Sequence, residues 1–283
     1  MKLSFKLNKM RGFRNDHKID GYLDWMKLNI TEKNVSLKAD YRGEKHGLEP
    51  EFQNRGGRKR ALQKEVKYRR DYLEKIRPRT NAVIKLLSDM KGESGLDVGI
   101  GYGYPGIILN QKFGVKVTGV EHPLNIEANC TVAESFGIKV IPWKFSEPIP
   151  VSPNSQDFII FSEVLEHLKL APAYVMRTLK NMLRHGGLLV LTTPNICRQE
   201  NIEKLETGHN IVEEYKNDEP DGEDPTDFMI HVREYSIEEV VSLLENSGFE
   251  VVAGYTCNQW PPDKPLDNNP LKNDIQIFKA VKL

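Results

Sequence analysis

The stretch LDVGIGYGYPG, residues 96–106, places three glycines at alternate positions directly after a short apolar run. Glycine lets the backbone turn sharply and approach a ligand without a side-chain clash. The apolar run predicts a buried strand, and the helix expected from residue 105 would present free N–H groups to that ligand. Glu121 ends the next predicted strand, where an acid can accept hydrogen bonds from both hydroxyls of a ribose. The stretch therefore predicts a nucleotide-binding turn between a strand and a helix.

Predicted strands alternate with predicted helices from residue 95 onward. We expect strands at 95–99, 115–121, 138–141, 157–162, 188–193, 249–256 and 275–281, and helices at 105–112, 123–136, 171–184 and 236–246. This alternation is typical of a parallel sheet with helices on both faces. A long Pro- and Asn-rich stretch at 260–274 joins the last two strands, which favours an antiparallel end. We predict an α/β fold: a Rossmann-like, doubly wound, mostly parallel seven-stranded sheet with an antiparallel final strand.

Residues 1–91 differ from the rest of the chain in charge. They hold 24 Lys and Arg against 12 Asp and Glu, whereas residues 92–283 hold 16 against 28. Apolar spacing predicts a basic helix over 60–77, which Pro78 ends, and a second helix over 83–90 that leads into the first core strand without a flexible linker. The opposite charges favour docking of the two parts, and an arm that binds nucleic acid or a membrane surface is the alternative. We therefore predict a basic, partly helical extension at 1–91 that covers the substrate side, and a core domain at 92–283.

The overall composition excludes several classes of protein. Hydrophobic residues make up 39% and charged residues 28%, a balance typical of a globular protein. There is no apolar run near the roughly 18 residues of a membrane span, and the N-terminus lacks the apolar block of a secretory signal. The three cysteines lie far apart and fit neither a disulfide framework nor a zinc site. We expect a cytoplasmic protein without a membrane partner, and the oligomeric state stays open.

Two nucleotide cofactors fit the glycine turn. The dinucleotide pattern GxGxxG matches Gly101, Gly103 and Gly106. The pattern Asp97-x-Gly99-x-Gly101-x-Gly103 instead resembles motif I of class I S-adenosylmethionine (SAM)-dependent methyltransferases. The runs EVLEHL at 163–168 and GGLLVLTTPN at 186–195 extend this second resemblance over residues 95–283. The resemblance implies that the cofactor is SAM.

The same resemblance implies the residues that bind SAM. In that family an acid at the position of Asp97 lies near the amino-acid end of the cofactor, and the ribose acid falls at Glu121. Many relatives place an Asp in the adenine loop, where this chain has PWKFSEPIP at 142–150 and offers Phe145 and Ser146 instead. The expected cofactor-binding residues are Asp97, Gly99, Gly101, Gly103, Glu121, Phe145, Ser146 and Ser162.

The run SEVLEHL at 162–168 carries two carboxylates and an imidazole after the fourth predicted strand. On a helical turn Glu163, Glu166 and His167 would share one face, while Leu165 and Leu168 would point to the core. Two carboxylates and an imidazole can form half of the shell of a divalent ion. The run also occurs in relatives without a metal, where these side chains line the acceptor pocket. Both interpretations stay open at this point.

The run resembles those of three kinds of O-methyltransferase: plant-type small-RNA 2′-O-methyltransferases, ubiquinone-biosynthesis enzymes, and bacterial and archaeal enzymes for glycans or small molecules. The small-RNA resemblance implies Mg²⁺ held by Glu163, Glu166, His167 and His231, and these ligand types also suit Mn²⁺. We expect His167 and Glu166 to be catalytic, with His167 as general base where no ion is bound. A divalent ion would direct a hydroxyl of a vicinal diol, so we predict a SAM-dependent O-methyltransferase for a sugar, glycan or other small diol.

Two further functions are compatible with the sequence. The basic segment at 55–79 could follow the phosphates of RNA, which would make the protein a ribose 2′-O-methyltransferase. The acidic segment at 213–227 is either a loop that borders the acceptor site or a solvated loop, and in the first case it disfavours a polyphosphate acceptor there. A SAM-binding regulator without turnover is the third possibility, against which the acids and histidines argue mildly.

Overall fold

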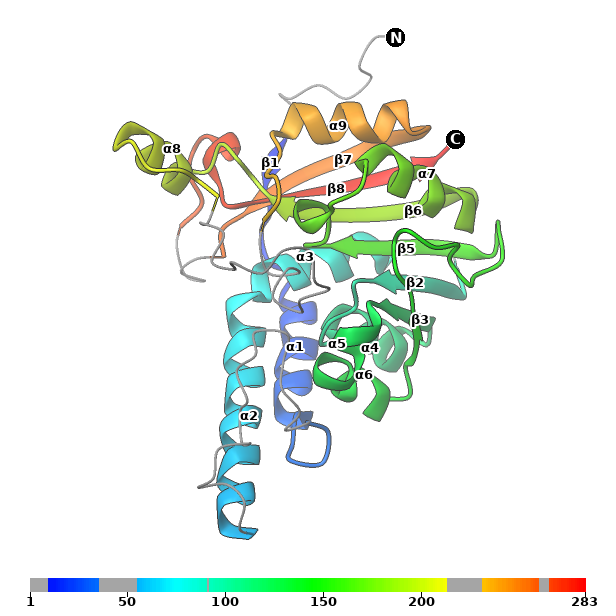
Figure 1. The fold of residues 1–283 in the computed structure, drawn as a ribbon, viewed down its shortest axis with the longest axis vertical. Helices are drawn as coiled ribbons and strands as arrows, with labels where there is room; N and C mark the ends of the chain where they lie inside the picture. The colour runs from blue at the N-terminus through cyan, green and yellow to red at the C-terminus, as the bar shows by residue number, and fades with distance from the viewer. Residues whose placement is uncertain (1–9, 36–54, 91, 213–230, 260–264) are drawn as a thin grey trace.

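A mixed sheet of eight strands forms the centre of the protein in the computed structural model, which describes residues 10–35, 55–90, 92–212, 231–259 and 265–283 (Figure 1). The strand order is β1-β7-β8-β6-β5-β2-β3-β4. The strands are β1 (Arg11–Gly12), β2 (Ser94–Val98), β3 (Lys116–Glu121), β4 (Lys139–Pro142), β5 (Gln156–Ser162), β6 (Leu183–Pro194), β7 (Phe249–Cys257) and β8 (Ile275–Lys282).

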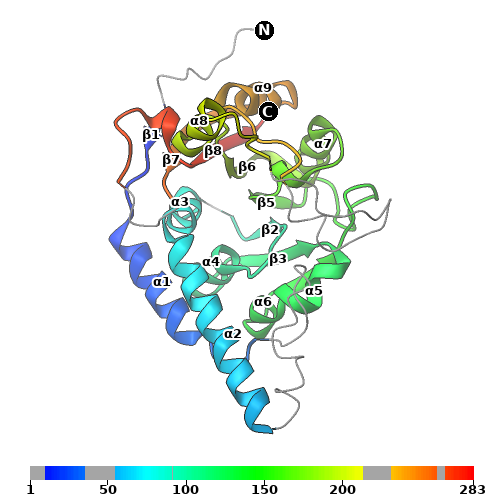
Figure 2. The ribbon, with the colours of Figure 1, turned by 60° about the vertical axis from the view of Figure 1, so that its left-hand side comes forward.

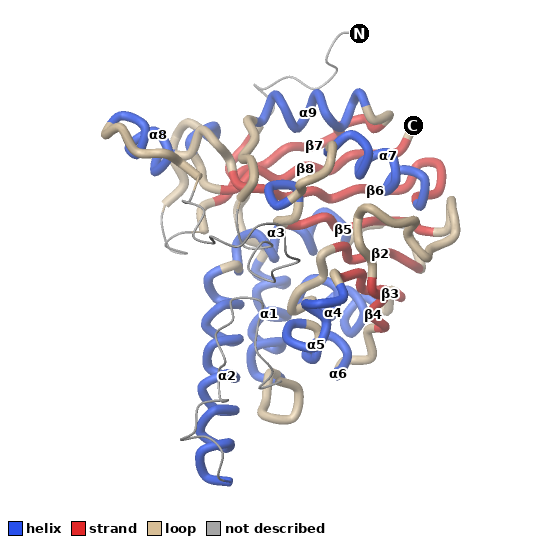
Figure 3. The backbone as a smooth tube through the Cα atoms, viewed as in Figure 1, coloured by secondary structure: helices blue, strands red, loops and turns tan. Residues whose placement is uncertain are grey.

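Helices cover both faces of the sheet (Figures 1 and 3). They are α1 (His17–Asn29), α2 (Arg55–Lys75), α3 (Arg77–Leu87), α4 (Tyr104–Phe113), α5 (Pro123–Asn129), α6 (Thr131–Ser135), α7 (Pro172–Met182), α8 (Gln199–Glu206) and α9 (Ile237–Asn246). One apolar core lies between α1, α3, α4 and one sheet face, and a second lies between α7, α9 and the other face. The structure therefore confirms the predicted doubly wound α/β class.

The direction of the strands determines which edge of the sheet can bind a ligand. Five neighbouring strands, β4, β3, β2, β5 and β6, are parallel, and β8 runs antiparallel to both β6 and β7, as predicted. The short strand β1 pairs with β7 and adds an eighth strand to the seven expected. Because the parallel strands end at one edge, the turn after β2, Glu121 and Ser162 come together there.

Several boundaries differ from the predicted ones, and three of the differences have a clear structural cause. The break between α2 and α3 lies at Ile76, and Pro78 is in the first turn of α3, where its missing N–H costs nothing. The helix expected over 123–136 is two helices that meet at Cys130. Strand β6 begins at Leu183 rather than residue 188, because its first residue already pairs with Gln156 of β5.

The long helix α2 carries much of the basic charge of the N-terminal segment. Its exposed residues include Lys59, Arg60, Lys64 and Lys67, and its first turns extend beyond the sheet in two views (Figures 1 and 2). The acidic segment at 213–227 lies outside the described residues. Neither α2 nor any other described helix combines the length and the apolar character needed to cross a membrane.

Candidate active site

A cavity of about 550 Å³ opens at the carboxyl ends of β2, β3 and β5. All eight residues expected to bind the cofactor line it: Asp97, Gly99, Gly101, Gly103, Glu121, Phe145, Ser146 and Ser162. In the turn after β2, the φ angles of Gly99, Gly101 and Gly103 are 70°, 51° and 72°. These are left-handed values that residues with a Cβ seldom adopt, so the sequence of this turn requires glycine.

The carboxylate of Asp97 fits a cationic ligand. Its side chain is buried, and its Oδ2 has no hydrogen-bond partner among the described residues. Burial, and then the negative charge of Glu121, raise the pKa of Asp97 to about 8, against a smaller opposing effect of the Gly106 N–H. A buried acceptor without a donor is costly, and a bound ammonium group would satisfy it. The amino group of SAM has the charge and the donors that this position lacks.

Glu121 is held in place by the glycine turn itself. Its Oε2 accepts from the Gly101 N–H at 2.9 Å, and its Oε1 accepts from the His122 N–H at 2.8 Å. Burial raises the pKa of Glu121. The hydrogen bonds from these two backbone N–H groups and from the amide of Asn125 offset part of this increase. A carboxylate oxygen accepts more than one hydrogen bond, so the same group can also receive the two hydroxyls of a ribose.

We expect Glu121→Ala to weaken SAM binding about tenfold to hundredfold, because losing hydrogen bonds to a charged acceptor costs roughly 1.5–3 kcal/mol. Isothermal titration with SAM and with S-adenosylhomocysteine measures the effect. Glu127→Ala is the matched control, since Glu127 lies on the exposed side of α5 and does not line the cavity. Equal SAM affinity in both variants would show that Glu121 does not bind the cofactor.

The N-terminal helices support the turn and complete the cavity. The guanidinium of Arg69 lies 3.6 Å from the ring centre of Tyr102, and the Tyr104 hydroxyl donates to the Arg69 carbonyl at 2.9 Å. Five residues of α2, α3 and their junction line the cavity: Tyr72, Ile76, Arg79, Thr80 and Val83. No sequence motif marked these residues, because they reach the site through the packing of helices that precede the core strands.

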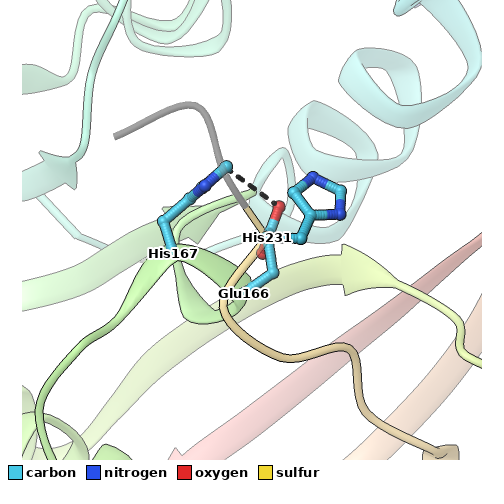
Figure 4. A group of neighbouring side chains, drawn as sticks. All are labelled: Glu166, His167 and His231. Carbon is cyan, nitrogen blue, oxygen red and sulfur yellow. Dashed lines mark ion pairs between the residues drawn. The ribbon is translucent and has the colours of Figure 1, made fainter. Parts of the chain in front are cut away.

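Three of the four proposed metal ligands gather beside the cavity. Glu166, His167 and His231 each offer a ligand atom, and these atoms lie within 4.8 Å of one another (Figure 4). Glu166 and His167 belong to a single 3₁₀ turn, Leu165–His167, after β5. The segment that carries His231 is joined to this turn, because the N–H groups of Val232 and Arg233 donate to the Glu166 carbonyl.

The fourth proposed ligand, Glu163, lies outside this cluster. Its Oε2 forms an ion pair with Nη1 of Arg79 at 2.8 Å, and its Oε1 accepts from the Thr192 hydroxyl at 2.8 Å. Its φ of 55° is left-handed, so the backbone does not continue a helical turn from Glu163 to Glu166. The expectation that Glu163 shares one helical face with Glu166 and His167 is therefore wrong, whereas Leu165 and Leu168 are buried as expected.

A second carboxylate, which the sequence interpretation missed, orients His231. The Nδ1 atom of His231 lies 3.0 Å from Oε1 of Glu234, and Arg198 and Asn201 both donate to Oε2 of Glu234. Burial alone would raise the pKa of Glu234, but these contacts outweigh it and lower the pKa to about 2. For His231, burial alone would lower the pKa. The hydrogen bond with Glu234 and the charge of Glu166 outweigh this effect, so the pKa of His231 is raised overall. The spacing His-x-x-Glu was the sequence signal for this pair.

The Glu166 carboxyl is enclosed, whereas His167 borders the cavity. Glu166 is 1% exposed, and its Oε2 accepts from the Thr193 hydroxyl at 2.8 Å. Burial, and then the charge of Glu163, raise the pKa of Glu166 to about 8. Its Oε1 lies 3.7 Å from Nε2 of His167, which itself lines the cavity. The cluster can thus hold an ion or pass a proton at the cavity wall.

A family model for the methyltransferase domain matches residues 66–253 of the chain. A SAM-dependent methyltransferase of Thermotoga maritima, described as a possible histamine N-methyltransferase, has a TM-score of 0.52 at 17% identity and covers 77% of this chain and 95% of its own. A putative methyltransferase of Haloferax volcanii, solved with the Trm112 activator, has a TM-score of 0.50 at 14% identity, covering 73% and 91%. No curated protein sequence matches significantly.

The cyclase SpnF also shares this fold, with a TM-score of 0.52 at 14% identity, and covers 96% of this chain and 97% of its own. Similarity at such low identity shows the fold alone, and one fold can support more than one reaction. The family model is more informative, because it spans most of the chain and includes both the glycine turn and the cluster. The chain belongs to the methyltransferase-domain family of class I SAM-dependent methyltransferases.

Proposed function

We propose that the protein is a metal-assisted O-methyltransferase for a vicinal diol of a sugar, glycan or other small molecule. The observation that carries this proposal is the contact between His231 and Glu234. A histidine that binds a metal characteristically gives its other ring N–H to a carboxylate. Since Nδ1 of His231 faces Glu234, its Nε2 is the nitrogen available to an ion.

The ligand set supports a particular choice of ion. With Glu163 paired to Arg79, the cluster offers one carboxylate and two imidazoles, from Glu166, His167 and His231. Compared with Mg²⁺, which prefers oxygen, transition metals such as Mn²⁺, Fe²⁺ and Zn²⁺ bind imidazole ligands better. We therefore propose Mn²⁺ ahead of Mg²⁺. A divalent ion there would supply Lewis-acid activation of an acceptor hydroxyl.

The chain's own residues would set the geometry of methyl transfer. SAM supplies an electrophilic methyl group, and the protein's task is to align the acceptor with it. Asp97 would hold the amino-acid end and Glu121 the ribose, which would direct the methyl toward the wall formed by Glu163 and His167. Without an ion, His167 on that wall would be the general base for the hydroxyl proton.

A methyl-transfer assay with labelled SAM tests the proposal. Sugars, catechols, histamine and RNA are offered as acceptors, each with excess chelator and with Mn²⁺ or Mg²⁺ restored. We expect transfer to diols only, lost in chelator and recovered best with Mn²⁺, while SAM affinity changes little. Methylation of histamine alone would overturn the O-methyl assignment, and full diol turnover in chelator would reduce the cluster to a metal-free pocket.

Methylation of RNA ribose is the second candidate, favoured by the exposed lysines and arginine of α2. It requires RNA binding that falls steeply with salt. Neutralising Lys59, Arg60 and Lys64 together would weaken such binding, whereas transfer to small diols would not change. SAM binding without any turnover would instead support a regulatory protein.

A further inference from the structure

A buried ion pair joins the N-terminal helices to the reaction end of the cavity. Arg79 of α3 has a side chain only 9% exposed, and that of Glu163 is 18% exposed. Both residues line the cavity. Arg79 engages Oε2 of Glu163 while the Thr192 hydroxyl engages Oε1, so neither carboxylate oxygen is directed to the cluster of Glu166, His167 and His231.

The backbone also fixes Glu163 in this position. Its left-handed φ of 55° is rare for a residue with a side chain, and such conformations persist where the surroundings enforce them. The Glu163 N–H donates to the Thr192 carbonyl at 2.9 Å, and the Thr192 hydroxyl also contacts that of Ser162 at 2.7 Å. The Glu163 carboxylate is still near enough for its charge to raise the pKa of Glu166 and of His231.

We infer that Arg79 is a positioning residue that withholds Glu163 from the ion and thereby sets the metal selectivity of the site. This inference rests on the proposed metal-assisted function. Without Arg79, the Glu163 carboxylate would join the cluster as a second carboxylate ligand. The added oxygen ligand would favour Mg²⁺. The added ligand would also fill a position that a catalytic metal site keeps open for its substrate. A side chain from the N-terminal helices thus determines which ion the core binds.

The test measures Mn²⁺ and Mg²⁺ affinity directly, with the metal alone and no acceptor, by titration calorimetry and by the electron spin resonance of free Mn²⁺. The variants are Arg79→Met, Glu163→Gln and the double variant. Glu163→Gln should leave Mn²⁺ affinity within about threefold of wild type, because Glu163 is not a ligand. Arg79→Met should gain roughly tenfold in Mg²⁺ affinity relative to Mn²⁺, and the double variant should lose that gain.

Arg77→Met is the matched control, since Arg77 begins the same helix but pairs with Glu74 and Asp24, away from the cavity. It should leave both metal affinities unchanged. Glu163→Gln keeps the test decisive if Arg79→Met does not fold: a loss of tenfold or more in Mn²⁺ affinity would show that the Glu163 carboxylate already acts on the ion beside Arg79, and would overturn the inference. An unchanged ion ratio in folded Arg79→Met would overturn it as well. Wild-type protein that binds neither ion would instead refute the proposed metal assistance, and this inference with it.

Discussion

His231→Ala is expected to lower kcat/KM for a diol acceptor by at least about a hundredfold and to remove the bound ion, because losing even an outer partner of a metal ligand costs roughly 10–100-fold. The fold should survive, since the side chain of His231 is 34% exposed and precedes α9 rather than packing in either core. Turnover, metal content and the thermal midpoint of the purified variant measure the three effects.

Two companion variants make this result specific. Glu234→Gln should give a smaller loss, because the amide can still accept from His231 but no longer stabilises its charge. His209→Ala is the control, since His209 is exposed and, within the described part of the chain, its ring bonds only to the Thr207 hydroxyl. Unchanged turnover in His231→Ala would show that the cluster does not act in the reaction.

The core of the fold was predictable because its signals are local. Glycines at alternate positions after an apolar run determine the turn from β2 to α4, and a capping box of Ser236 and Glu239 begins α9, where the sequence predicted a helix over 236–246. Helix α1 was missed although Ile19, Leu23 and Met26 have helical spacing and Asp16 caps it. Charged and aromatic residues between these positions obscured a pattern that depends on contact with α3 and α4.

The candidate site was predictable where strand order alone brings residues together. Asp97, Glu121 and Ser162 lie at the ends of three neighbouring strands, so parallel pairing is enough to place them in one cavity. The position of Glu163 was not predictable, because it depends on a left-handed φ in a residue other than glycine and on Arg79 of a distant helix. Local spacing describes a helical turn and cannot include a partner 84 positions away.

Asp97→Asn is expected to weaken SAM binding by roughly a hundredfold or more, because removing one partner of a buried charge pair costs about 3–5 kcal/mol. The same change should stabilise the cofactor-free protein at pH 8. The raised pKa of Asp97 means that the folded state holds this proton more tightly than the unfolded chain does. The contribution of this proton to the stability of the folded state is complete below the pKa of Asp97 in the unfolded chain, near 4. It is lost as the pH rises to about 8, the pKa in the folded state.

The affinity of the wild-type protein for SAM should therefore depend on pH in a defined direction. Below pH 8 the empty site holds a protonated Asp97, so pairing with the ammonium group of SAM must release a proton, and affinity should rise with pH. Above about pH 8 the amino group itself loses its proton, so affinity should fall again. Calorimetry in buffers of different ionisation enthalpy counts the protons, and Asp97→Asn should abolish their release.

Asp157→Asn provides the control with the opposite sign. Asp157 lies near the start of β5, at the end of the strand away from the cavity. Burial alone would raise its pKa, but the N–H groups of Ser94 and Glu93 and the charge of Arg184 lower it overall. Its replacement should lower the thermal midpoint near neutral pH and leave SAM affinity unchanged. For Asp97→Asn each kcal/mol gained should raise the midpoint by about 2–4 °C at pH 8, with the gain vanishing toward pH 4. A lower midpoint at pH 8 with undiminished SAM affinity would show that Asp97 is a structural acid, and that the ammonium group of SAM binds elsewhere.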